Sequence, residues 1–192
     1  MNTLLLHCRP GFESEVCSEI SEHAARLDVP GYAKAKPDTA CAEFICSDEA
    51  GAERLMAGLR FSQLIFIRQW ARGRFIELPE KDRISVLLEH LAPLPTFGSL
   101  WLEVFDTNDG KELSGFCKKF EGPLRKALTG AGKLAEDARA ARLLLTFKSG
   151  REVFLGMAAP GNSAIWPMGI PRLKFPREAP SRSTLKLSLI HI

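Results

Sequence analysis

The chain has 192 residues, of which 45% are hydrophobic and 26% charged, so its composition is that of a globular protein with one large or two small domains. No apolar run approaches the roughly 18 to 20 residues that span a bilayer, and the segment after Met1 is too short and lacks the basic flank of a signal peptide, so a cytoplasmic protein is expected. The net charge of +3 is uneven: residues 1–110 carry 11 Lys/Arg against 17 Asp/Glu, whereas residues 111–192 carry 15 against 6, which favours binding of a polyanion by the second half, with a merely solvated basic surface as the alternative.

The first seventy residues alternate between strand and helix patterns. A buried strand is predicted over residues 3–8, and a helix over 13–27 from the spacing of its apolar residues. The remaining patterns are strands at 31–36 and 40–47, a helix at 48–59, and one long or two consecutive strands over 64–78. The order β-α-β-β-α-β indicates a ferredoxin-like domain over residues 1–78.

A second α/β domain is predicted over residues 79–165, after a boundary rich in proline and charge. Its expected elements are a helix at 84–91, a strand at 99–107, a helix from 111 to about 129, and a hairpin formed by 140–150 and 151–158. The proline-rich residues that follow are expected to form an ordered connecting segment.

The helix after residue 110 carries the candidate polyanion site. Lys111, Lys118 and Arg125 recur every seven residues with Lys119 and Lys126 beside them, and the apolar residues fall on the other side. Gly122-Pro123 is expected to kink or split this helix. Such a face would give salt-sensitive binding to nucleic-acid phosphates, supported by Arg172 and Lys174 further on, and a solvated helix face is the alternative.

Other motifs favour structural roles. "TGAGKL" (129–134) lacks the spacing and the Ser/Thr of a phosphate loop and is predicted to be a glycine helix stop. His7, His23 and His90 lie in separate elements, so no metal site is expected, and the five cysteines form no C-x-x-C pair and are expected to be buried free thiols. All three tryptophans, Trp70, Trp101 and Trp166, are predicted to lie in the core, with platforms on which nucleic-acid bases stack as the alternative.

Several segments resemble one known family. They are "CRPGFE" (8–13), "FSQLIFIRQW" (61–70), "EVFDTNDGKEL" (103–113), "FCKKFEGPLRKAL" (116–128) and "MGIPRLKFPREAPSRSTLKL" (168–187), and they look like the N-terminal half of the bacterial large-subunit ribosomal RNA methyltransferase M family. The resemblance implies a ferredoxin-like domain, a THUMP-type RNA-binding domain and then a Rossmann-like methyltransferase domain. It also implies methyl transfer from S-adenosylmethionine to a cytidine ribose 2′-oxygen of 23S ribosomal RNA by a monomer, with no metal and no membrane.

The resemblance assigns one catalytic residue and leaves the cofactor site outside this chain. In "SRSTLKL" the lysine is the first of a Lys-Asp-Lys-Glu tetrad, which maps onto Lys186, whose alternative is a solvated helix lysine. Residues 166–187 would connect to the missing catalytic domain, and "SLIHI" (188–192) departs from the family and is expected to be non-native. The chain alone is therefore predicted to be an inactive RNA-recognition half, and the alternative is a free-standing THUMP-type RNA-binding or assembly protein.

Overall fold

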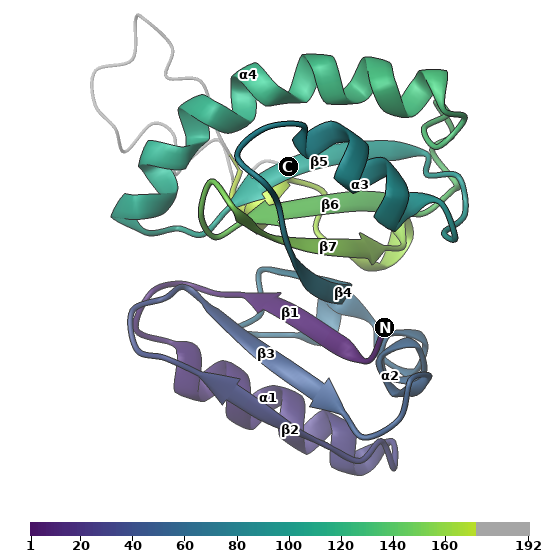
Figure 1. Ribbon diagram of the computed structural model, residues 1–192. Coiled ribbons are helices and arrows are strands. Elements are labelled where there is room, and N and C mark those ends of the chain that lie inside the picture. Colours follow the sequence, from purple (N-terminus) through teal and green to yellow (C-terminus); the bar gives the residue numbers. More distant parts are fainter. Residues whose placement is uncertain (172–192) are drawn as a thin grey trace, which may run out of the picture.

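The protein is described here by a computed structural model over residues 1–171. Its strands form one seven-stranded sheet in the order β2-β3-β1-β4-β7-β6-β5 (Figure 1). The predictions made for Arg172, Lys174, Lys186 and residues 188–192 lie outside the described residues.

The first half has the predicted ferredoxin-like order. Its strands β2, β3, β1 and β4 lie side by side and every neighbouring pair is antiparallel. Helices α1 and α2 connect β1 to β2 and β3 to β4. The elements are β1 (Thr3–His7), α1 (Glu13–Arg26), β2 (Gly31–Ala35), β3 (Cys41–Cys46), α2 (Gly51–Gly58) and β4 (Gln69–Glu77).

The second half is an α/β unit whose long helix crosses between two parallel strands. Strand β5 pairs parallel with β6, which forms an antiparallel hairpin with β7. The elements are α3 (Arg83–Leu91), β5 (Ser99–Val104), α4 (Asn108–Gly130), β6 (Arg142–Phe147) and β7 (Glu152–Ala158). Short 3-10 helices lie at Phe61–Gln63, Pro160–Asn162 and Pro167–Gly169.

The two halves share the sheet through β4, which pairs with β1 on one side and with β7 on the other. Gly73 of β4 lies opposite Gly156 of β7, and a Cβ at Gly73 would come within 2.0 Å of the Leu155 carbonyl oxygen. Glycine therefore permits close approach of the two backbones at this seam. The boundary predicted between residues 78 and 79 stays a prediction.

The sheet curls, so that one face packs against the helices and the other face turns inward on itself. The register places Leu4, Met157 and Leu143 on one face, and Leu4 belongs to the core cluster of α1 and α2 while the other two belong to that of α3 and α4. In Figure 1, α1 lies beside β2 and β3 in the lower half of the view, and α4 lies beside β5 in the upper half. The opposite face turns inward, and there His7 of β1 contacts Thr146 of β6, two strands that are not neighbours in the sheet.

The predicted strand over residues 64–78 is wrong in its first part, because β4 begins only at Gln69. The preceding backbone bonds to a side chain instead of a strand: the Glu19 carboxylate of α1 accepts hydrogen bonds from the amides of Ile65 and Phe66. Ile65 is 80% exposed despite its β-branched side chain. A helix side chain thus overrode the local strand propensity.

The predicted break at Gly122-Pro123 is also wrong in part, because α4 continues through Pro123 as one helix of 23 residues. Proline removes one backbone donor and crowds the preceding turn. Both residues lie on the exposed side, where water can reach the carbonyl that loses its donor, while Leu124 and Leu128 hold the buried side against the sheet. The helix ends at Gly130, and Gly132 takes the left-handed conformation (φ +68°), which confirms the glycine helix stop.

Candidate nucleic-acid interface

Helix α4 begins where the Thr107 hydroxyl accepts from the Gly110 amide at 3.1 Å, an N-cap that satisfies one free donor of the first turn. Cys117, Leu124 and Leu128 point into the core. All five predicted basic residues of this helix are exposed: Lys111, Lys118, Lys119, Arg125 and Lys126. The separation into an apolar and a basic face is as predicted, whereas contact of the basic face with RNA stays a prediction.

The five cations are not equally available. Arg125 lies 2.8 Å from Glu121 and also donates to the Leu100 carbonyl at 3.3 Å, and Lys111 donates to Asn108 at 3.2 Å. Within residues 1–171, no ion pair involves Lys118, Lys119 or Lys126. These three ammonium groups can meet phosphates without first losing a carboxylate partner, so we name them the α4 lysine patch.

A cleft of about 800 Å³ opens beside the start of α4, between the β2–β3 turn and the end of β6. Phe75, Phe105 and Phe147 contribute apolar surface, and three lysines lie around it: Lys34, Lys36 and Lys148. Two of these cations are already paired, Lys34 with Glu43 at 3.3 Å and Lys148 with Glu152 at 2.9 Å. The cleft is therefore a weaker candidate for binding phosphate than the α4 lysine patch.

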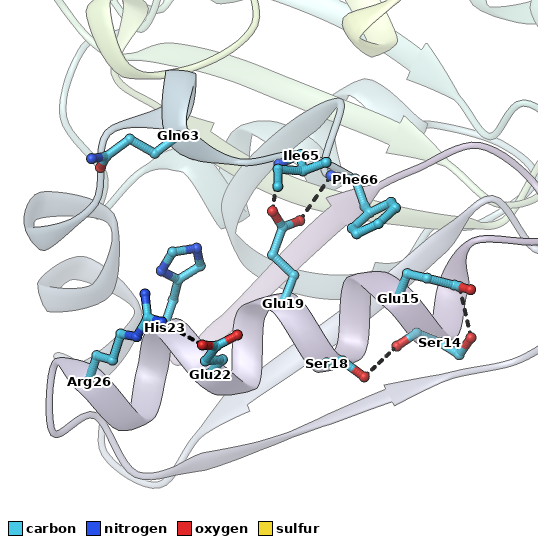
Figure 2. A pocket seen from close by; sticks show the side chains of 10 residues that line it. All are labelled: Ser14, Glu15, Ser18, Glu19, Glu22, His23, Arg26, Gln63, Ile65 and Phe66. Atoms are coloured by element: carbon cyan, nitrogen blue, oxygen red, sulfur yellow. Dashed lines mark hydrogen bonds and ion pairs between the residues drawn. The ribbon is translucent and has the colours of Figure 1, made fainter.

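The opposite side of the molecule is acidic. Figure 2 shows a groove of about 570 Å³ between α1 and the 63–66 segment, lined by Glu15, Glu19 and Glu22. The Glu19 carboxylate accepts hydrogen bonds from the Ile65 and Phe66 amides, and Glu22 forms an ion pair with Arg26. The carboxylates make this groove an unfavourable site for a polyanion.

A polar cluster lies on the inner face of the sheet, where the two halves meet. We call it the polar junction; its members are buried and come from β1, β4, β5 and β6: His7, Gln69, Glu103, Arg142 and Thr146. His7 Nε2 lies 3.3 Å from Thr146 Oγ1 and 3.6 Å from Glu103 Oε2. The Arg142 guanidinium stacks on the Trp101 ring at 3.5 Å.

Burial shifts the pKa values of two junction residues in opposite directions, and in both cases it favours the uncharged form. It lowers the pKa of His7 to about 4, so this imidazole is neutral and its contact with Glu103 is not an ion pair. It raises the pKa of Glu103 to about 7, although the Met168 amide, Gln69, Arg142 and Thr146 favour the charged carboxylate. Glu103 therefore holds its proton at pH values where an exposed glutamate is ionised.

We predict that these two shifts nearly cancel in the pH dependence of stability. Between pH about 4 and 6.5 the folded protein binds less proton at His7 than the unfolded chain, so this residue makes the free energy of unfolding rise with pH. Between pH 4.5 and about 7 it binds more at Glu103, which makes the free energy fall with pH. The substitution Glu103→Gln removes the contribution of Glu103 and leaves that of His7. Its stability relative to the unsubstituted protein should therefore increase from pH 4.5 to 7, by about 3 kcal/mol at most.

Urea unfolding at several pH values between 4.5 and 7.5 measures this, and His7→Gln is the matched control, since its relative stability should fall as pH rises from 4.5 to 6.5. If Glu103→Gln instead runs parallel to the unsubstituted protein across the whole range, the raised pKa of Glu103 is wrong.

Sequence reasoning missed the polar junction. A glutamate inside the apolar run "LWLEVF" and a histidine ending "TLLLH" were available signals, because buried strands rarely carry unpaired polar residues.

The predicted tryptophan core is correct for Trp70, which is fully buried, and wrong for Trp166, which is 43% exposed after β7. The five cysteines are free thiols, three of them buried. Among residues 1–171, no three His, Cys, Asp or Glu side chains gather as a metal site would require.

Comparison with known proteins gives matches in both halves. The family model "RlmM ferredoxin-like domain" matches residues 1–71, and "Ribosomal RNA large subunit methyltransferase M, N-terminal" matches residues 82–159. The chain is 79% identical over 187 residues to a ribosomal RNA large subunit methyltransferase M of Pseudomonas fluorescens (strain Pf0-1), covering 97% of this chain and 52% of that protein. It is equally identical, with the same coverage, to the protein of that name in Pseudomonas syringae pv. syringae.

Two solved structures share the fold at low sequence identity. TrmN from Thermus thermophilus matches with a TM-score of 0.50 and 19% identity over 81% of this chain and 44% of that chain. PH1313 from Pyrococcus horikoshii Ot3 matches with a TM-score of 0.51 and 8% identity, over 81% and 54%. The mixed α/β class, with a ferredoxin-like and a THUMP-type part, is confirmed. No helix within the described residues is long and apolar enough to cross a membrane.

Proposed function

Because this chain belongs to the ribosomal RNA large subunit methyltransferase M family, and spans about half the length of the curated relatives it matches, we propose that it is the RNA-recognition half of a ribosomal RNA methyltransferase. The complete protein would use S-adenosylmethionine to methylate a cytidine ribose 2′-oxygen of 23S ribosomal RNA, acting as a monomer. The cofactor would bind to the half that follows this chain, and the chain by itself would be inactive.

The observation that carries the proposed RNA contact is the α4 lysine patch. Lys118, Lys119 and Lys126 are exposed, lack ion-pair partners within residues 1–171, and lie on a helix whose other side is anchored in the core. A rigid row of cations suits the phosphate backbone, and it contributes affinity without base specificity. The acidic groove along α1 would keep the RNA from binding on the other side.

We predict that charge reversal in the patch weakens RNA binding and its dependence on salt. Each phosphate contact adds about 0.7 to 0.9 to the slope of log affinity against log salt. Lys118→Glu/Lys126→Glu should therefore flatten the slope by about 2 units. Fluorescence anisotropy with a structured fragment of 23S ribosomal RNA, from about 50 to 200 mM salt, measures this.

The control is Arg26→Glu/Arg60→Glu, which removes the same charge from two exposed arginines of the first half. Its slope should stay close to that of the unsubstituted chain. Equal flattening by both pairs would show that only net charge matters, and an unchanged slope in the α4 variant would remove α4 from the RNA interface.

A further inference from the structure

The backbone after β7 is tied to both halves of the protein. Asn162 accepts from the Phe61 amide at 2.7 Å and donates to the carbonyls of Met56 and Leu59, each at 2.8 Å. Its own carbonyl accepts from Trp70 Nε1 at 2.6 Å. We call residues 162–169 the exit segment, because the chain runs from it toward residue 172.

The polar junction binds the same segment from the inner face of the sheet. Gln69 accepts from the Ala164 amide at 3.2 Å, and Arg142 donates to the Ala164 carbonyl at 2.9 Å. Glu103 accepts from the Met168 amide at 2.6 Å. A buried carboxyl group is costly unless it is hydrogen-bonded, and here part of that requirement is met by the backbone of the exit segment.

The last turn of the exit segment has an unusual conformation. Met168 (φ 59°, ψ 9°) and Gly169 (φ 65°) are both left-handed, a region that costs a non-glycine residue free energy and persists only where the surroundings impose it. A Cβ at Gly169 would lie 1.9 Å from the Arg68 carbonyl oxygen. The turn thus packs closely against the start of β4, while the Met168 side chain is buried in the core cluster of α3 and α4.

We infer that the polar junction and the Met168–Gly169 turn form a latch that fixes the direction in which the chain leaves the two RNA-recognition domains. Glu103 and Gly169 are then positioning residues for the catalytic half that would follow. This role rests on the proposed function, since it matters only if a catalytic half must be held at a set distance from the bound RNA. Misplacement of reacting groups by about 1 Å can cost about a hundredfold in rate.

The latch itself is tested in this chain by hydrogen exchange. In Glu103→Ala the Met168 amide loses the Glu103 acceptor, and its exchange should accelerate by about tenfold or more, the usual consequence of removing the acceptor of a buried backbone donor. Glu103→Gln keeps an acceptor oxygen and should exchange within about threefold of the unsubstituted chain. Equal exchange in all three proteins would overturn the latch.

The consequence for catalysis is tested in the complete protein with two glycine variants. Gly169→Ala should displace the turn and lower kcat at least about tenfold, with the RNA dissociation constant within about twofold. Gly161→Ala is the matched control: its Cβ would meet nothing within 4 Å, and both constants should stay unchanged. A kcat for Gly169→Ala within twofold of normal overturns the positioning role.

The two hypotheses fail separately. If the unsubstituted complete protein transfers no methyl group to 23S ribosomal RNA, the proposed function is wrong and the positioning role falls with it, whereas the exchange result still decides whether the latch exists. If methyl transfer is normal and insensitive to Gly169→Ala, only the inference is wrong.

Discussion

Replacing Lys186 with alanine in the complete protein is expected to lower methyl transfer to 23S ribosomal RNA by about 100- to 10,000-fold, the range typical of losing a positioned acid–base group. The assignment rests on the resemblance of "SRSTLKL" to the family, because Lys186 lies outside the described residues. An ammonium group at the reacting ribose can stabilise negative charge on the hydroxyl oxygen, or accept its proton if burial lowers the pKa.

The diagnostic result is a lower rate constant for methyl transfer with an unchanged RNA dissociation constant. For Lys186→Ala, the rate constant at saturating RNA should fall while the RNA dissociation constant stays within about twofold, because the lysine would act on the reacting hydroxyl and not on phosphates. Lys174→Ala is the matched control with the opposite pattern: weaker binding with a normal rate at saturation. Near-normal turnover by Lys186→Ala would return this residue to the simpler interpretation of a solvated helix lysine.

Trp70→Ala should lower the free energy of unfolding by about 3 to 5 kcal/mol. The indole is fully buried in the core cluster of α1 and α2, packs against Phe61 with ring centroids 5.8 Å apart, and donates to the Asn162 carbonyl. Alanine would leave a cavity and also free the exit segment from one of its bonds. Because the free energy of unfolding of a whole domain is only about 5 to 15 kcal/mol, this substitution would remove a large part of it.

Urea unfolding measures this loss, with two comparisons. Trp70→Phe fills most of the cavity but cannot donate to Asn162, so its loss should be intermediate. Trp166→Ala, at a side chain that is 43% exposed, should change stability by no more than about 0.5 kcal/mol. Equal losses at Trp70 and Trp166 would contradict the burial that distinguishes them.

The sequence by itself determined the elements whose pattern is local. The helix at α4 follows from apolar residues three and four apart, and the basic side follows from lysines and an arginine seven apart, because a helix has 3.6 residues per turn whatever it packs against. The ferredoxin-like order follows in the same way from alternating strand and helix patterns. The family resemblance came from contiguous segments, which also need no knowledge of the fold.

Tertiary structure alone decided the features that join distant residues. Residues 64–68 have strand propensity, yet the amides of Ile65 and Phe66 bond to Glu19 of α1, more than forty residues earlier. The polar junction unites His7, Glu103 and Thr146 only because the sheet curls and brings β1 over β5 and β6. At the left-handed turn, the Met168 amide donates to Glu103, and Gly169 lies close to the Arg68 backbone, both far away in the sequence. Local propensity differs by about 1 kcal/mol between residues, whereas burial and hydrogen bonding of several groups together contribute more, so long-range contacts decided the conformation at these sites.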